Sequence, residues 1–260
     1  MLLVDSDLPA GAHTNTQPYE GRGWCLMERS ASGLVKHTAT LISLKGLTGE
    51  ERSLREVYNN GRAARAPPVA PAAFTSTLEA GVASGDTKFT NSGDVPLVGK
   101  IYGWAFAAEM EAVVALFYFN LGWDDAQMLA LCAALRAAHA GGGLRKVEVL
   151  RLGGNKMGDG GAAALAALLE EGAMPNLKKL FLSFNQIAND GVAALASALR
   201  GGALPSCTTI KLHRNPGSDA RRIGDVDSKV KEALASPERA AALARRRDEP
   251  SAQAEAQGPC

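Results

Sequence analysis

A thirty-residue repeat in the second half of the chain constrains the fold more than any other feature of the sequence. The segment Leu150–Met157 (LRLGGNKM) recurs as Leu180–Ile187 (LFLSFNQI) and begins a third time at Ile210–Asn215 (IKLHRN). Asparagines at positions 155, 185 and 215 mark the period. A fixed period of this length is typical of a solenoid, in which each unit buries its apolar face only against its neighbours. Solenoids present an extended concave surface, so the repeat favours binding over catalysis.

Each unit contains a short strand, an asparagine turn, a helix and a return loop. A glycine follows each of the first two asparagines, and an alanine-rich stretch with leucines at helical spacing comes next. Further glycines end this stretch, and Pro175 and Pro205 prevent the helix from restarting before the next strand. We therefore expect an α/β solenoid with one β-strand and one α-helix per repeat.

The pattern L-x-x-L-x-L-x-x-N-x-(I/M), followed by G-x-x-x-L and a long helix, resembles the ribonuclease-inhibitor type of leucine-rich repeat. The resemblance covers residues 112–217. It implies that the leucines fill the interior and that each asparagine bonds backbone groups in its turn. The residues with a structural role under this resemblance are Leu150, Leu152, Asn155, Gly161, Leu165, Leu180, Leu182, Asn185, Gly191, Leu195, Leu212 and Asn215.

A weaker copy of the unit precedes these repeats, so we expect three to four repeats within residues 111–236. Leu116 and Tyr118 match Leu150 and Leu152, and a helix is expected at 124–140, but Leu121 replaces the asparagine. A terminal repeat is expected to be atypical, because one of its faces meets something other than a repeat. At the other end, the segment 228–236 predicts a final helix with Ser228 as its N-cap.

The inner face of the strands contains the residues that we expect to bind a partner. In L-x-L the leucines point inward and the residue between them points out, because side chains alternate along a strand. Three columns of outward residues result. The first contains Phe117, Arg151, Phe181 and Lys211; the second Phe119, Gly153, Ser183 and His213; the third Glu148, Lys178 and Thr208. A phenylalanine between an arginine and a lysine suits an anchor for a protein partner, although these rings could equally cover the sheet or contact the N-terminal region.

The first 110 residues show no period and predict a small mixed α/β region. We expect helices at 24–36, 72–82 and 95–110, and short strands at 2–4, 40–44 and 88–90. A loop is expected at 5–18 and a polar, arginine-rich linker near 49–66. Residues 237–260 are polar and alanine-rich, which predicts a disordered tail.

The WCxxE stretch (Trp24, Cys25 and Glu28) resembles the tryptophan-cysteine helix start of Toll/interleukin-receptor (TIR) domains. Its pairing with leucine-rich repeats also resembles two-part proteins predicted from unicellular algae, which have no assigned activity. Some TIR domains cleave NAD with a glutamate that precedes this motif. The segment that carries this glutamate has no counterpart before Trp24, so the chain is either truncated at its start or merely similar. The three residues otherwise fit a core tryptophan and cysteine at a helix start.

Composition limits the remaining possibilities. A net charge of +1 implies no strong attraction to nucleic acid or anionic membranes. The four cysteines have no metal-binding spacing, and His13, His37, His139 and His213 lie in separate segments, so we expect neither a metal nor another cofactor. The first residues predict no signal peptide, and no apolar stretch is long enough to span a bilayer, which favours a cytoplasmic protein.

A protein-interaction module, as in a scaffold or signalling adaptor, is therefore the function that the sequence favours. We do not expect an enzyme. The alternatives are a TIR-like N-terminal enzyme that cleaves NAD, and a GTPase activator, because one such family uses this type of repeat. Solenoids of that family are much longer than three to four repeats, so the GTPase activator is the least favoured alternative.

Overall fold

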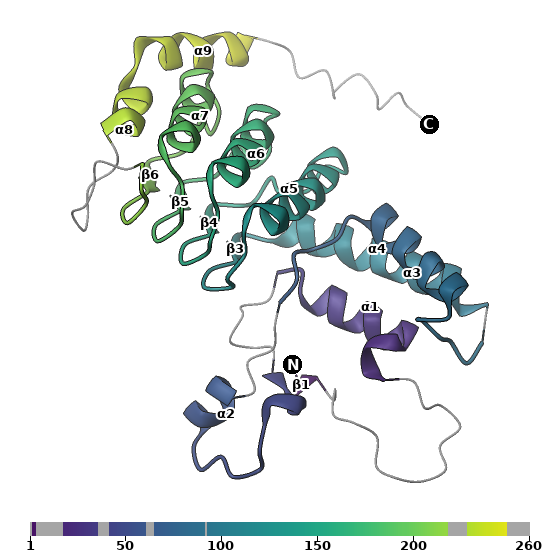
Figure 1. The fold of residues 1–260 in the computed structure, drawn as a ribbon. Coiled ribbons are helices and arrows are strands. Elements are labelled where there is room, and N and C mark those ends of the chain that lie inside the picture. Colours follow the sequence, from purple (N-terminus) through teal and green to yellow (C-terminus); the bar gives the residue numbers. More distant parts are fainter. Residues whose placement is uncertain are drawn as a thin grey trace, which may run out of the picture.

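The computed structural model describes residues 2–3, 18–35, 42–60, 65–91, 93–217 and 228–248. At its centre lies a four-stranded parallel sheet in which the strands follow chain order. The strands are β3 (Ala115–Phe117), β4 (Val149–Arg151), β5 (Lys179–Phe181) and β6 (Thr209–Lys211). Along one side of the sheet stand the repeat helices (Figure 1), α5 (Asp125–Ala140), α6 (Asp159–Glu170) and α7 (Asn189–Arg200). The expected short α/β solenoid is confirmed.

The leucines of the repeat form the interior of this solenoid. Leu116, Leu150, Leu180 and Ile210 are paired in register across the four strands, and each is at most 1% exposed. The second leucine of each L-x-L and the helix leucines at 165 and 195 are buried as well. Since full burial of a leucine is worth about 1.5–3 kcal/mol, this column of apolar side chains accounts for the stacking of the repeats.

Each repeat asparagine joins its own turn to the turn of the preceding repeat. The side chain of Asn185 donates to the carbonyl oxygens of Leu182 (2.9 Å) and Leu152 (3.0 Å), and it accepts from the amide of Met157 (3.2 Å). Asn155 and Asn215 form the same bonds one repeat earlier and later. Asn155 therefore also satisfies the turn in which Leu121 replaces the asparagine.

Gly161 and Gly191 allow each helix to lie close to the preceding repeat. A Cβ atom at Gly191 would lie 2.7 Å from Cγ2 of Ile187 and 3.0 Å from Cβ of Ala162. At Gly161 it would lie 2.8 Å from Cγ of Met157. Any side chain at these two positions would push the helix away from its neighbour.

Helices of the N-terminal region close the first end of the solenoid. The amide of Leu144 donates to the carbonyl of Met110 (2.7 Å), so α4 (Asp94–Ala112) takes the place of a preceding repeat helix. Phe74 of α3 (Pro71–Ser84) stacks on Tyr102 of α4, and α1 (Gly23–Ser32) lies beside α4 (Figure 1). Apolar residues of these helices and of the repeats form one continuous core.

A buried arginine joins this N-terminal region to the first strand. Arg65 is 6% exposed, and its guanidinium donates to the carbonyls of Gly33 (2.6 and 2.9 Å), Leu34 (3.2 Å) and Phe117 (2.7 Å). The ring of Tyr118 lies 4.4 Å from the guanidinium carbon. Burial lowers the pKa of Arg65 from its ordinary value, but carbonyl oxygens and the ring face replace the lost hydration.

A second buried arginine closes the other end, and here the expected disordered tail is wrong in part. Residues 237–248 form helix α9 (Pro237–Asp248), which follows α8 (Ser228–Ala235). Arg239 donates to the carbonyls of Leu199 (2.9 Å), Ala203 (2.7 Å) and Leu204 (2.7 Å), and those of Leu199 and Leu204 also accept from backbone amides of the last repeat. The polar composition gave no signal for this role, because a single buried arginine makes these contacts. Residues 249–260 and the N-cap bond of Ser228 lie outside the described residues.

Two further expectations for the first 110 residues require correction. The expected linker near 49–66 contains a helix, α2 (Leu54–Asn60), which begins after a network in which Glu51 accepts from Thr48 and Asn60. Residues 88–90 do not form the expected strand. Lys88 forms an isolated β-bridge with Arg22, and α4 begins a few residues later.

The remaining elements of this region are short. Two strands, β1 (Leu2–Leu3) and β2 (Ile42–Ser43), pair in parallel within the expected segments. Residues 19–21 and 44–46 form single 3₁₀ turns, η1 (Tyr19–Gly21) and η3 (Leu44–Gly46). The expected loop up to residue 17, His13 and His37 lie outside the described residues. Among the helices of the described chain, none is sufficiently long and apolar to cross a membrane.

Candidate functional site

Cations and aromatic rings alternate across the outward face of the sheet. Strand pairing places Phe117, Arg151, Phe181 and Lys211 in one register, as the sequence predicts. The guanidinium carbon of Arg151 lies 5.7 Å from the ring centre of Phe117 and 4.8 Å from that of Phe181. The ammonium of Lys211 lies 5.6 Å from the ring centre of Phe181. We call these four residues the aromatic–cation row.

Both cations of the row are exposed and lack anionic partners within the described part of the chain. Among its salt bridges, none involves Arg151 or Lys211. Cation–π contacts of this kind are worth about 0.5–1 kcal/mol at exposed sites, and they consume no N–H donor. The row therefore presents two positive charges whose hydrogen-bonding capacity is available to a ligand.

A hollow of about 380 Å³ lies beside the row, where the strands lead into the asparagine turns. Gly153 and Gly154 contribute no side chains here, whereas the neighbouring repeats carry Phe119 and Asn120 on one side and Ser183 and Phe184 on the other. A Cβ atom at Gly154 would lie 1.8 Å from Oδ1 of Asn120, and one at Gly153 would lie 2.9 Å from the carbonyl oxygen of Ser183, so the two glycines let the neighbouring turns lie close together. Its remaining lining comes from Arg151, Phe181, Lys211 and His213.

His213 forms the polar edge of the hollow. Its Nδ1 lies 2.9 Å from Oγ of Ser183, and its ring meets that of Phe184 edge to face at 5.3 Å. Partial burial and then the charges of Lys211 and Arg214 lower the pKa of His213 below its ordinary value. Within the described residues, no carboxylate contacts the ring, so the pair lacks the group that orients histidine in a catalytic triad.

Phe184 is the prominent residue that sequence reasoning missed. It is 56% exposed and adopts a left-handed backbone conformation with φ of 59°. The corresponding residues Asn120, Gly154 and Arg214 have φ between 55° and 70°, so the turn before each asparagine requires this conformation. The L-x-L alternation does not extend into the turn, and for this reason it gave no signal for position 184.

The third predicted column separates from the other two. Nζ of Lys178 lies 2.6 Å from Oε1 of Glu148 in a surface ion pair, and neither residue lines the hollow. The hydroxyl of Thr208 bonds the backbone carbonyl of Lys178 (3.4 Å). The structure therefore gathers Arg151, Phe181, Ser183, Lys211 and His213 around the hollow, places Phe117 beside them, and leaves Glu148 and Lys178 to pair with each other.

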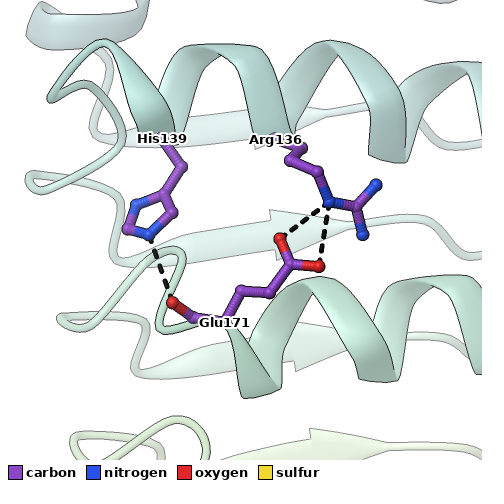
Figure 2. A network of polar contacts seen from close by, with 3 residues as sticks. All are labelled: Arg136, His139 and Glu171. Carbon is purple, nitrogen blue, oxygen red and sulfur yellow. Dashed lines mark hydrogen bonds and ion pairs between the residues drawn. The ribbon is translucent and has the colours of Figure 1, made fainter.

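A polar clasp joins two repeats at the helix layer and does not form part of this site. Figure 2 shows Arg136 of α5 pointing at the carboxylate of Glu171, with Nε at 2.9 and 2.7 Å from its two oxygens. Nε2 of His139 lies 3.2 Å from the backbone carbonyl oxygen of Glu171. The ion pair raises the pKa of Arg136 and lowers that of Glu171. Since both side chains are exposed, the clasp adds little stability.

The WCxxE residues of the N-terminal region lie at the start of α1, but the expected core tryptophan is wrong, because Trp24 is 37% exposed and Cys25 is only half-buried. Nε1 of Trp24 donates to Oδ2 of Asp94 (3.0 Å), which ties α1 to α4. Burial, and next the nearby Glu28, raise the pKa of Cys25, so its reactive thiolate form is disfavoured. In the part of the chain that the structure describes, no three His, Cys, Asp or Glu side chains form a group that could hold a metal ion.

Two segments of the chain, residues 143–166 and 173–196, match the family model described as Leucine Rich repeat. Both segments run from the return loop through the strand and asparagine turn into the following helix, so the match coincides with the repeat seen in the fold. These matches support a leucine-rich-repeat protein. None of the curated proteins compared with the chain matches it.

Proposed function

We propose that this chain is a protein-interaction module, as in a scaffold or signalling adaptor, and that it binds its partner on the concave strand face. Leucine-rich repeats are in general protein-interaction modules. The observation that carries the proposal is the aromatic–cation row, in which two exposed cations without anionic partners among the described residues alternate with two aromatic rings. Aromatic and arginine side chains are the residue types that dominate the binding energy of protein interfaces.

Two finer assignments belong to this proposal. The ribonuclease-inhibitor type is supported by the thirty-residue period and by the twelve-residue helix of both central repeats. A cytoplasmic location is supported by the free thiols of Cys25, Cys132 and Cys207, since cysteines remain reduced in that compartment. Neither enzymatic alternative is favoured by a specific observation, so we propose a binding rather than a catalytic role.

Affinity capture from the native cell lysate tests the proposal. The wild-type chain is compared with the double variant Phe181→Glu, Lys211→Glu, and a matched control carries Lys146→Glu with Ala167→Glu away from the hollow. Circular dichroism first establishes that all three are folded. We expect partners that the wild type and the control retain and that the concave-face variant loses. Identical partners for all three chains would show that this face has a structural role only.

A further inference from the structure

The charge around the hollow points to an anionic ligand. Arg151 and Lys211 line it, and no carboxylate does. These two residues lie on β4 and β6, two strand spacings or about 10 Å apart. An extended ligand that crosses the strands could thus present one anionic group to each of them.

The side chain of Phe184 gives a second indication. Its backbone conformation belongs to the repeat turn, because the corresponding Asn120, Gly154 and Arg214 share it. Of these four turn positions, 184 alone carries an aromatic ring, and Phe184 is 56% exposed. Exposed aromatic side chains are typical anchors of protein interfaces, and this ring forms one wall of the hollow.

From these observations we infer that the hollow binds an acidic segment of a partner protein. The segment places an apolar side chain against Phe184 and directs two carboxylates about 10 Å apart at Arg151 and Lys211. This inference rests on the proposed function, because it specifies the chemistry of the partner that the concave face would hold.

A nucleic acid fits the hollow less well than an acidic peptide. Binding to a phosphate backbone depends on many cations, because each neutralised phosphate contributes by releasing counterions. The hollow offers two unpaired cations, and the whole chain has a net charge of only +1. By contrast, an apolar wall beside two cations suits a short peptide with one apolar and two acidic side chains.

Selection of peptides from a random dodecapeptide library, displayed on phage, tests this inference with the full chain as bait. Each enriched peptide is synthesised with a fluorophore, together with a matched peptide in which Asn and Gln replace Asp and Glu. Affinities are measured by fluorescence anisotropy for the wild type, Arg151→Glu with Lys211→Glu, and Phe184→Asn. The control is Lys146→Glu with Lys156→Glu, which changes the net charge equally outside the hollow. Asn is chosen at 184 because Asn120 occupies the same conformation in the first repeat.

We expect the enriched peptides to carry two acidic residues that flank an apolar one. Their affinity should fall about tenfold or more with the Arg151→Glu, Lys211→Glu variant and with Phe184→Asn. It should fall likewise for the matched peptide in which Asn and Gln replace Asp and Glu, and it should persist in the Lys146→Glu, Lys156→Glu control. Thermal melting of Phe184→Asn separates binding from folding, because relief of strain should leave its melting temperature unchanged or higher.

Several results would overturn the inference, and they differ in what they imply for the proposed function. Peptides without acids that lose affinity only with Phe184→Asn would leave the concave face as the binding surface. Peptides that bind all variants equally would contradict both proposals. An empty selection would contradict the acidic peptide as the ligand. Displacement of the peptides by a single-stranded RNA oligonucleotide with higher affinity for the wild type would identify a nucleic acid as the ligand instead.

Discussion

At the residue scale, the asparagines show how one side chain can define a repeat. Each of them bonds two carbonyls and at least one amide that belong to two successive turns. These bonds are buried, and a buried backbone group without a partner is costly. The period of 30 residues visible in the sequence is therefore the period of this bonding pattern.

Replacing Asn185 by alanine should lower the free energy of unfolding by about 1–3 kcal/mol, because buried carbonyl and amide groups lose their partners. Chemical denaturation monitored by circular dichroism measures the change. Gln186→Ala is the control, since Gln186 is exposed and adjacent. An unchanged midpoint for Asn185→Ala would show that the asparagine bonds do not hold the repeats together.

The lowered pKa of His213 has a consequence for stability that can be measured. The folded state binds a proton at this ring less readily than the unfolded state, whose pKa is near 6.5. The contribution of His213 is therefore fully present above pH 6.5 and is lost as the pH falls through the folded-state pKa. The neighbours of the ring are Lys211 and Arg214, whose charges lower its pKa, Ser183, whose hydroxyl lies 2.9 Å from Nδ1, and the ring of Phe184.

We thus expect the stability of the wild type relative to His213→Asn to decrease between pH 7.5 and pH 5. Melting temperatures of both chains across this range give the difference, in which the titration of other groups cancels. A constant difference would mean that the ring has the same proton affinity in both states.

At the element scale, Arg65 and Arg239 take the place of capping repeats at the two ends of the solenoid. Arg65 donates to carbonyls directly after α1 and in the first repeat strand, and Arg239 donates to carbonyls at the end of α7 and in the last return loop. A guanidinium suits both ends because its N–H groups are rigidly arranged and can serve several carbonyls at once. Solenoid ends need such partners because no further repeat satisfies them.

Arg239→Ala should release α9 while leaving the central repeats intact. Hydrogen exchange measured by mass spectrometry should show faster exchange in 237–248, by about tenfold or more, since three hydrogen bonds from a charged group are lost. Arg245→Ala, at an exposed position of the same helix, is the control. Equal exchange in both variants would indicate that Arg239 is not what holds α9 on the solenoid.

The elements that could be predicted from the sequence are those with a repeated or strongly periodic pattern. The repeat strands, the helices after them, α3 and α4 fall within a few residues of their expected positions. α2 and α9 were missed because a short or polar helix carries no apolar period, and their contacts include hydrogen bonds of individual side chains, Glu51 and Arg239, that no pattern marks. In the site, register predicted the aromatic–cation row. The hollow depends on how the turns of neighbouring repeats lie beside one another and on the φ of Phe184, which strand alternation does not reveal.

At the scale of the whole molecule, one core extends from α3 and α4 through the repeats to α8. Trp123 illustrates the continuity, because it stacks on Tyr118 and donates to the carbonyl of Arg65 (2.9 Å). The N-terminal helices therefore close the solenoid, where the sequence alone suggested a separate region up to residue 110.

This continuity predicts a single cooperative unfolding transition. Urea denaturation should give coincident curves for helix content and for the fluorescence of Trp123, measured in a chain with Trp24→Phe and Trp104→Phe, because the shared core loses its packing at once. In the wild-type chain, the curve for helix content is compared with that for tyrosine fluorescence, which controls for effects of the two substitutions. Fluorescence changes at lower urea than helix content would instead show that the N-terminal helices detach first.

Photo-crosslinking in the native cell tests the central claim, that the concave strand face binds a protein partner, most directly. Benzoylphenylalanine replaces Phe181 on the strand face in one chain and Ala193, at an exposed position of α7, in another. We expect a discrete protein adduct from position 181 and none from position 193. An adduct from position 193 alone would assign binding to the helix layer and contradict the proposed function.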